Sequence, residues 1–552
     1  MCFGKQCLLS MKRSHINESL YVLLMKKLND LEYLKLNKFR RFWYRFLMFF
    51  VAIPGFFVKL GKGIVGFFVD LGIDIKNGVL DIFNTFRHGN WAVKLSFLVF
   101  GMGNLYYGQI LRGLFFLLFE AIFIAYMLVP SGGIYWMSKV NWFQTGQTIG
   151  TVQGGKVVEY VEYNGLKIPV ETWVNGDDSV KVLLYGLLTV VFIVAFIWTW
   201  RLQIKQCRIC MDITAQGKKI KSGKDDIRSL VDDQFHKTLL ALPVVGILVF
   251  TVLPIIFMVL VAFTSYDAKH DGYANLFSWV GWEHFNELLD FGSGGLGLAF
   301  GEILSWTLMW SFFATFTNYF LGMFVAMMIN KKGIKLKKLW RTVLVLTIAI
   351  PQFVSLLYVS KLFDSSGIVG ELLGKIPFIK NYLLSNNYIS LWDSPTVAKF
   401  LVITINIWVG IPYMMLQATG ILMNIPADLY ESSRVDGASP WQQYVRITLP
   451  YMLFVTGPAL LTSFVSNLNN FNVIYLLTGG NPLNTEIGMA GGASVGHTDL
   501  LITWLFKMTL GSTDSRYYMA SVVGILIFAV CAILSLIIYN VIPSTKNEED
   551  FN

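Results

Sequence analysis

Long apolar stretches alternate with short polar segments along most of the 552 residues. Several stretches are long enough to cross a hydrocarbon core about 30 Å thick, which takes roughly 20 helical residues. We expect spans near residues 112–129, 181–200, 238–265, 301–329, 342–363, 397–423, 451–475 and 517–541. An even number of crossings places both termini on one side. The pattern predicts an all-α polytopic membrane protein with about eight transmembrane helices.

The polar segments divide the chain into three regions. Residues 1–90 form a basic leader in the cytoplasm or at the membrane surface, residues 91–235 an N-terminal membrane hairpin, and residues 236–552 a six-helix core. A charged cytoplasmic linker, Gln203–Lys237, joins the hairpin to the core. Within the hairpin, residues 92–110 are apolar but broken by glycines, so the pattern leaves open whether they cross the membrane or re-enter it.

The leader has no apolar core of the kind that a signal peptide needs. The sequence leaves open whether translation starts at Met1 or Met11. Its segments Phe39–Phe50 and Gly61–Phe83 place charged residues among bulky apolar ones. Both are typical of amphipathic helices that lie in the membrane interface, although a helical arm packed on the protein fits the same pattern.

A small β-rich cap is expected between the first two spans, over residues 131–180. Thr151–Tyr163 and Leu166–Val174 are rich in β-branched and aromatic residues, and Asn164-Gly165 separates them. Two such runs joined by Asn-Gly predict a β-hairpin. The span count places this cap outside the cell.

Charge and composition support the membrane assignment. The chain is 55% hydrophobic and only 14% charged, and its formal net charge is +10. Most lysines and arginines fall on the side of the termini, which the positive-inside rule makes cytoplasmic. We therefore expect a multi-pass protein of the plasma or inner membrane, with cytoplasmic termini, that contacts anionic membrane lipid and binds no nucleic acid. Cys207 and Cys210 form a C-x-x-C without the further ligands of a zinc site, so no metal or cofactor is expected.

The segment 424–450, between the sixth and seventh spans, carries the most specific pattern. Ala427–Val435 suits a short helix, and Asp436-Gly437 supplies a turn after it, because glycine tolerates positive φ where a helix stops. Ser439-Pro440 then starts a second short helix, with serine as the cap and proline in the first turn. We expect Pro450 to begin the next span. The result is a cytoplasmic helix–turn–helix.

This segment resembles the EAA loop of ABC-importer permeases, which docks on the ATPase subunit. Glu431 heads the motif, Gly437 is its glycine, and Ile447-Thr448-Leu449-Pro450 closes it, while Ser432-Ser433 replace the two alanines. The resemblance gives an ATPase-coupling role to Glu431, Asp436, Gly437, Ala438, Ile447 and Pro450. Residues from about 236 to 541 resemble the MalF-type permeases of maltose and maltodextrin importers, although Asp267–Leu296 is too short for the external domain of that type.

The MalF-type resemblance implies an assembly and a transported substrate. It implies a second, MalG-like permease subunit, two ATPase subunits, an extracytoplasmic sugar-binding protein and an oligosaccharide substrate. It maps the substrate contacts onto Val409, Gly410, Tyr413, Ser463, Ser466, Asn467, Asn470 and Asn472. Ser466 stands where the family has an aromatic ring and Asn472 where it has an aliphatic residue, so the identity of the sugar is left open.

The residues themselves also favour a polar face on the seventh span. Ser463, Asn467 and Asn470 follow one another at i, i+4 and i+7, which is one face of a helix. In the sixth span, Gly410-Ile411-Pro412-Tyr413 interrupts an apolar run, and such breaks often line a cavity. The alternative is that the asparagines join neighbouring helices by amide hydrogen bonds.

Other kinds of protein remain as alternatives. The chain has no phosphate-binding G-x-x-x-x-G-K-[ST] motif, so we expect it to be no enzyme and ATP hydrolysis to belong to separate subunits. An ion-coupled secondary transporter would use intramembrane acids such as Glu120, which otherwise is a structural residue with a hydrogen-bond partner. An ABC permease for a solute other than sugar is the other alternative.

Overall fold

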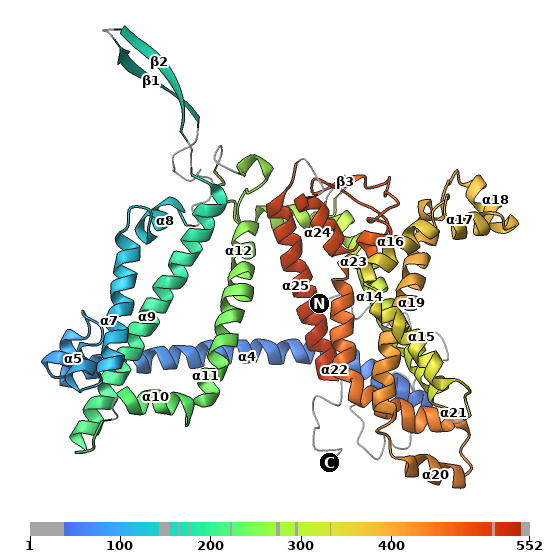
Figure 1. Ribbon diagram of the computed structural model, residues 1–552, viewed down its shortest axis with the longest axis horizontal. Helices are drawn as coiled ribbons and strands as arrows, with labels where there is room; N and C mark the ends of the chain where they lie inside the picture. The colour runs from blue at the N-terminus through green and yellow to red at the C-terminus, as the bar shows by residue number, and fades with distance from the viewer. Residues whose placement is uncertain are drawn as a thin grey trace, which may run out of the picture. The chain divides into compact units, whose positions relative to one another are not determined.

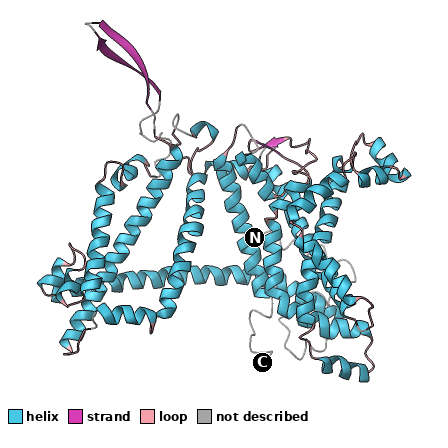
Figure 2. Cartoon of the chain, viewed as in Figure 1, coloured by secondary structure: helices cyan, strands magenta, loops and turns pink. Residues whose placement is uncertain are grey.

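The computed structural model describes residues 38–142, 155–163, 166–174, 177–220, 223–271, 276–292, 296–331, 333–510 and 514–541. Both candidate start residues, Met1 and Met11, lie outside them. The described chain is mostly helical, with a few short strands (Figure 2). It divides after His88 into two units.

The described part of the first unit is one helix, α4 (Lys38–His88), of 51 residues. The sequence pattern predicted two separate amphipathic helices in this region. The helix is continuous instead, although Pro54 lies within it. Between Gly61 and His88, the residues whose side chains are described are largely exposed.

The second unit begins with two five-residue helices, α5 (Trp91–Leu95) and α6 (Met102–Tyr106). Residues 92–110 therefore fold as a short hairpin of helices and do not cross the membrane. Two long helices follow, α7 (Ile110–Leu128) and α9 (Ser179–Ala215), with α8 (Gly133–Lys139) between them. The linker predicted after residue 203 is largely helical, because α9 runs on to Ala215 and α10 (Gly223–Val231) follows.

The β-cap is a two-stranded antiparallel hairpin. Strands β1 (Gly155–Tyr163) and β2 (Leu166–Val174) pair from Gly155 opposite Val174 to Tyr163 opposite Leu166. The register leaves two residues for the connection, as Asn-Gly predicts; these two lie outside the described residues.

The rest of the second unit follows in the order shown in Figure 1. Its first part consists of α11 (Phe235–Ile247), η2 (Leu248–Val252), α12 (Leu253–Ala262), η3 (Ala268–His270), α13 (Glu283–Leu288), α14 (Leu296–Asn330), α15 (Lys337–Ala349) and α16 (Gln352–Leu362). Next come α17 (Ile368–Gly374), α18 (Pro377–Ser385), η4 (Leu391–Asp393), α19 (Pro395–Leu422), α20 (Ala427–Val435), α21 (Pro440–Gln443), η5 (Tyr444–Thr448) and α22 (Leu449–Leu468). The last elements are α23 (Phe471–Leu477), β3 (Met489–Ala490), β4 (Ala493–Ser494), α24 (Leu501–Leu510) and α25 (Tyr517–Val541).

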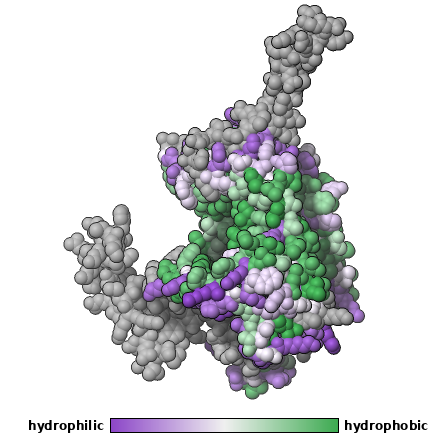
Figure 3. Space-filling view, turned by 90° about the vertical axis from the view of Figure 1, so that its left-hand side faces the viewer, coloured by the Kyte–Doolittle hydropathy of each residue, from purple (hydrophilic) through white to green (hydrophobic). Residues whose placement is uncertain are grey.

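Among the described residues, seven helices are long and apolar enough to cross a membrane, and one bent pair could form an eighth span. Apolar side chains cover the middle of the surface drawn in Figure 3, and hydrophilic ones gather above and below them. This distribution is the one expected of a protein surrounded by lipid between two aqueous phases.

Two of the eight predicted spans differ from the structure. The span predicted at 342–363 consists of α15 and α16, which meet at an angle of 92°. Pro351 lies at the bend, where its preceding residue, Ile350, has extended backbone angles, as expected before a proline. The span predicted at 451–475 ends at Leu468, and α23 is a separate short helix.

The core is centred on α14, which packs along α19 and α22. Glycines allow the first contact to be close. A Cβ atom on Gly322 of α14 would lie 2.4 Å from Met414 of α19, and one on Gly410 would lie 2.4 Å from Asn318. Apolar clusters pack on both sides of the Asn318–Gly410 contact. One includes Trp306, Trp310 and Val402, and the other includes Met323, Met415 and Met452.

Candidate functional site

A pocket of about 180 Å³ lies between these two apolar clusters, where α14, α19 and α22 meet. Its walls combine small, polar and apolar side chains. They are Ala314, Thr315, Asn318, Gln352, Asn406, Val409, Gly410, Tyr413, Met414, Leu460, Ser463 and Asn467. None of these described lining residues is an acid, a lysine, an arginine or a histidine. The pocket therefore offers neutral hydrogen-bonding groups, one aromatic ring and apolar surface.

The two most buried asparagines of the pocket, Asn318 and Asn406, are each only 6% exposed. The Asn318 amide nitrogen donates to the carbonyl of Ala314 at 2.8 Å and to that of Asn406 at 3.5 Å. Its Oδ1 and the Nδ2 of Asn406 are buried and have no hydrogen-bond partner. A buried polar group without a partner costs about 1–3 kcal/mol. One acceptor and one donor thus remain unused in the pocket wall.

Asn467 is held in place from three directions. Its Nδ2 donates to Thr315 Oγ1 at 3.0 Å, its Oδ1 accepts from Asn470 Nδ2 at 3.1 Å, and its backbone carbonyl accepts from the Trp310 indole at 3.1 Å. Helix α22 ends one residue later, at Leu468. The amide is therefore positioned at a helix end and joined to α14.

Five of the eight predicted substrate residues line this pocket: Val409, Gly410, Tyr413, Ser463 and Asn467. Asn470 lies outside the lining but bonds to Asn467. Ser466 and Asn472 are exposed and also lie outside it.

One part of the reasoning behind these predictions was wrong. Asn470 shares no helix with Ser463 and Asn467, because α22 has ended; it caps α23 instead, accepting from Val473 N. The run from Gly410 to Tyr413 interrupts the apolar pattern but not the helix, because α19 is continuous through Pro412. Gly410 acts by its size, since it leaves room for Asn318.

Sequence reasoning missed Thr315, Asn318, Gln352 and Asn406. Each is a polar residue within or next to an apolar stretch, and that signal was available, because such residues usually face the interior of a helix bundle. The missing information was which helices are neighbours, since Asn318 and Asn406 lie 88 positions apart in the chain.

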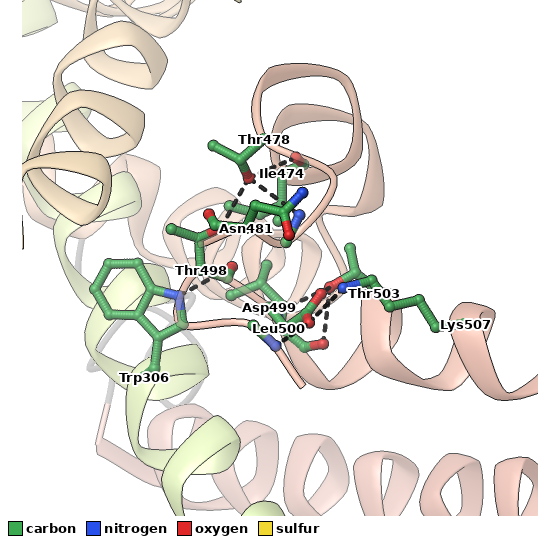
Figure 4. Close-up of polar contacts among 11 residues, drawn as sticks. Trp306, Ile474, Thr478, Asn481, Thr498, Asp499, Leu500, Thr503 and Lys507 are labelled. Carbon is green, nitrogen blue, oxygen red and sulfur yellow. Dashed lines mark hydrogen bonds and ion pairs between the residues drawn. The ribbon is translucent and has the colours of Figure 1, made fainter. Parts of the chain in front are cut away.

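A loop between α23 and α24 lies beside Trp306 of α14 (Figure 4). The Trp306 indole of α14 donates to the carbonyl of Thr498 at 3.2 Å, and the Thr498 hydroxyl lies 2.7 Å from that of Thr478. Asp499 accepts from Thr503 at 2.9 Å and pairs with Lys507 at 2.7 Å. These contacts hold both ends of the loop and attach it to α14.

At the other end of α19 the segment 424–450 forms the predicted helix–turn–helix. Gly437, the second residue after the end of α20, has a φ of +76°, and its N–H donates to the carbonyl of Arg434 at 3.0 Å. Ser439 and Gln442 form a capping box at the start of α21, with Pro440 in its first turn. Both short helices and the turn thus lie where the sequence places them. The six predicted coupling residues are all at least partly exposed. The exposed ones are Glu431, Asp436, Gly437 and Pro450, and the half-buried ones are Ala438 and Ile447.

One feature of this segment differs from the expectation. Pro450 does not begin the span, because α21, η5 and α22 form one continuous helix from Pro440 to Leu468. Pro450 has no N–H to donate, and the turn before it is a π-helix, Tyr444–Thr448. The second short helix is therefore the extension of the span that carries Ser463 and Asn467.

The two short helices are tied together by side chains. Gln443 Nε2 donates to the carbonyl of Tyr430 at 3.1 Å and to Ser433 Oγ at 2.7 Å. The Tyr430 hydroxyl lies 2.8 Å from that of Thr448. Apolar side chains remain on the outside of the pair, where Val435 is 89% and Trp441 70% exposed.

Comparison with known proteins finds a matching family model and several similar permeases. Residues 318–546 match the family model described as "Binding-protein-dependent transport system inner membrane component". The maltodextrin transport system permease protein MalC of Streptococcus pneumoniae is 31% identical over 383 residues, which are 68% of this chain and 84% of that protein. MdxF of Bacillus subtilis, another maltodextrin permease, is 32% identical over 68% of this chain and 85% of its own. The galactooligosaccharides permease GanP of the same organism is 29% identical over 84% of this chain and all of its own.

Proposed function

This chain belongs to the binding-protein-dependent transport system inner membrane components, and from that membership we propose that it carries oligosaccharides across the membrane by alternating access. It is a multi-pass permease component of an ABC importer. In this family ATP hydrolysis belongs to separate ATPase subunits. The substrate, the partner subunits and the orientation are part of the proposal.

The pocket at Asn318 and Asn406 is the observation that supports a sugar substrate. A sugar hydroxyl both donates and accepts hydrogen bonds, and the pocket wall offers one unused acceptor and one unused donor. The sugar ring has apolar C–H faces, for which Tyr413, 49% exposed, supplies a flat partner. At about 180 Å³ the pocket has the size of one sugar ring, so we propose that it holds one ring of a longer chain.

The relatives support the class of substrate and leave its identity open. MalC and MdxF are named for maltodextrin, and GanP for galactooligosaccharides. Both substrates are neutral oligosaccharides, and the described lining of the pocket is neutral too. We therefore propose a neutral oligosaccharide and name no particular sugar.

The continuous helix from Pro440 to Leu468 supports a coupling mechanism. Over its 29 residues such a helix is roughly 40 Å long at 1.5 Å per residue. One end is tied to α20 through Gln443 and the other end carries Asn467. A force on the exposed segment at 424–450 would therefore reach the pocket through one rigid element. In the proposed cycle, closure of the ATPase subunits moves this helix, and the two apolar clusters beside the pocket open in turn.

The proposed assembly contains two ATPase subunits, a second, MalG-like permease subunit and an extracytoplasmic sugar-binding protein. The exposed side chains Val435 and Trp441 suit docking into a groove of an ATPase subunit. We propose coupling roles for the six residues that the motif names, and cytoplasmic termini as the positive-inside rule favours.

Gly437→Pro tests this proposal. Proline cannot adopt a φ of +76° and has no N–H for the bond to Arg434, so the turn must rearrange. We expect unchanged membrane insertion but loss of ATP-driven sugar uptake, by about 10-fold or more, measured in proteoliposomes with the ATPase subunits and the binding protein. A matched control is Gly420→Ala, because Gly420 lies in α19 with open space around its Cα. Normal uptake by the proline variant would contradict the docking role, and uptake without any ATPase would overturn the proposed function.

A further inference from the structure

We infer that residues 61–88 of α4, here called the surface segment, lie along the membrane surface and bury one apolar face among the lipid acyl chains. Attachment of this segment to lipid is independent of the transported substrate. Three features support it: the distribution of residues around the helix, the charge of the segment and the point where the chain enters the next unit.

The apolar face of the surface segment is continuous. Val65, Phe68, Ile75 and Val79 follow at spacings of three, seven and four residues, which keeps them on one side of a helix. These side chains are between 52% and 63% exposed. Surfaces in contact with water seldom expose a continuous row of bulky apolar side chains, so we expect this face to be buried against another apolar surface.

The opposite face is polar. Asp70, Asp74 and Asn77 follow at spacings of four and three residues and are exposed. With Lys76, the two aspartates place three charges within seven residues. Each charge at the centre of a membrane helix costs about 2.5–3.5 kcal/mol, so this segment suits a position along the surface rather than across the bilayer. Its residues 65–79 extend over roughly 21 Å at 1.5 Å per residue.

The unit that follows α4 begins beside the boundary of a span. His88 ends α4, and Asn90 caps α5 two residues later by accepting from Val93 N at 2.9 Å. The turn after α5 is bonded to α9, where the Trp200 indole donates to the carbonyl of Phe97 at 3.2 Å. Arg201 follows directly in α9, after a long apolar run, and is exposed. Such a basic residue marks the edge of a membrane span, so the second unit begins at the level of the lipid headgroups.

The charge of the segment predicts how it binds. Residues 61–88 contain three basic side chains, Lys62, Lys76 and Arg87, and three acidic ones, Asp70, Asp74 and Asp81, so the formal charge is zero with His88 neutral. Basic interfacial helices are attracted to anionic lipid, and this segment has no net charge of its own for such an attraction, although α4 carries five basic residues before it, Lys38, Arg40, Arg41, Arg45 and Lys59. The attachment of the surface segment should therefore rest on apolar burial and require no anionic lipid.

Spin labels on the full-length chain in lipid nanodiscs test the inference. Cys2, Cys7 and Cys531 are replaced by serine, while Cys207 and Cys210 are buried and can stay. Labels are placed through Phe68→Cys and Val79→Cys on the apolar face, and through Asp70→Cys and Asn77→Cys on the polar face. Collisions are measured with oxygen, which concentrates in lipid, and with a water-soluble nickel chelate.

We expect the ratio of oxygen to nickel collisions to be several-fold higher at 68 and 79 than at 70 and 77. This difference between the two faces should already be present in neutral nanodiscs and at high salt. Nickel access on both faces would mean that the helix lies in water, and protection of positions 68 and 79 from both reagents would mean that a protein covers this face. Either result, or a need for anionic lipid, would overturn the inference.

A pair of substitutions gives a second measurement with a matched control. Val79→Asp adds a charge to the apolar face, and Asn77→Asp adds the same charge to the polar face. With a label at Phe83→Cys, we expect the oxygen-to-nickel ratio to fall several-fold in the first variant and to stay unchanged in the second. Equal effects of the two aspartates would also contradict a one-sided attachment.

Discussion

The N-terminal hairpin and the six-helix core both contain polar side chains beside long apolar helices, but they use them differently. In the hairpin, Gln203 accepts from Gly101 N at 3.2 Å and donates to the carbonyl of Ser96 at 2.5 Å. Glu120 accepts from Phe100 N at 2.8 Å. In the core, Asn318 and Asn406 each keep one buried polar atom without a partner. The N-terminal region pairs its polar side chains with backbone N–H and carbonyl groups, whereas the core has polar side-chain atoms without a partner among the described residues.

This difference separates a structural role from a binding role. Polar groups in an apolar environment are costly unless they are paired, so the paired set stabilises the fold of α5 and α6 against α9. The unpaired groups of Asn318 and Asn406 carry the free-energy cost of burial without a partner, and a bound ligand that pairs with them can remove this cost. Residue type alone does not make this distinction, since amides occur in both regions.

The largest expected effect comes from Asn406→Leu, which removes an unpaired amide from the pocket. Because Asn406 Nδ2 has no partner among the described residues, the substitution breaks no side-chain bond from that atom and should leave the melting temperature nearly unchanged. A lost hydrogen bond to a sugar hydroxyl is worth about 0.5–1.5 kcal/mol, so uptake should fall by up to about 10-fold. The measurement is initial uptake at limiting substrate, normalised to the amount of protein in the membrane.

A matched control lies two residues away. Thr404→Val makes a similar polar-to-apolar change on an exposed face of α19, where the hydroxyl bonds only to the carbonyl of Phe400. It should transport normally. If Asn406→Leu lost stability instead of uptake, the distinction between the two regions would be wrong.

A smaller effect on transport, but a larger one on stability, is expected from Gln203→Leu. This change leaves Gly101 N–H and the Ser96 carbonyl without the side chain that pairs them, at about 1–3 kcal/mol for each buried group. The melting temperature in detergent should fall, while uptake for each folded molecule stays normal. Gln206→Leu is the control, because Gln206 is partly exposed and bonds to Arg112, which water can reach more easily. Equal losses in both variants would contradict the structural role of Gln203.

The sequence was sufficient for the parts of the fold that depend on local pattern. Ser439 and Pro440 start a helix and Gly437 ends one because capping and φ preferences act over a few residues. The hairpin at residues 155–174 follows from the same kind of signal. Among the described residues, seven candidate spans and one bent pair of helices lie where the sequence predicted eight apolar spans.

What the sequence did not reveal depends on contacts between distant segments. The end of α22 at Leu468 was missed because Asn467, Asn469 and Asn470 continue an acceptable helical pattern. The bonds of Asn467 to Thr315 and Trp310 of α14, which favour a stop there, join segments far apart in the chain. Gly410 was recognised as part of a break in an apolar run, but the sequence did not show that this glycine makes room for Asn318 on another helix. Five of the predicted pocket residues follow from the family resemblance, and Asn318 and Asn406 require the packing of α14 against α19.

The smallest effect is expected at Glu120, the residue on which an ion-coupled mechanism would depend. The side chain is buried, and its Oε2 accepts from Phe100 N. Glu120→Gln keeps an oxygen that can accept this bond and removes the titratable group, so uptake should stay within about 2-fold and keep its dependence on pH. Glu120→Leu removes the acceptor and should destabilise the protein by about 1–3 kcal/mol without changing uptake for each folded molecule. If the glutamine variant lost transport while remaining as stable as the wild type, Glu120 would act through its charge, and the hairpin would belong to the transport mechanism rather than to the support of the fold.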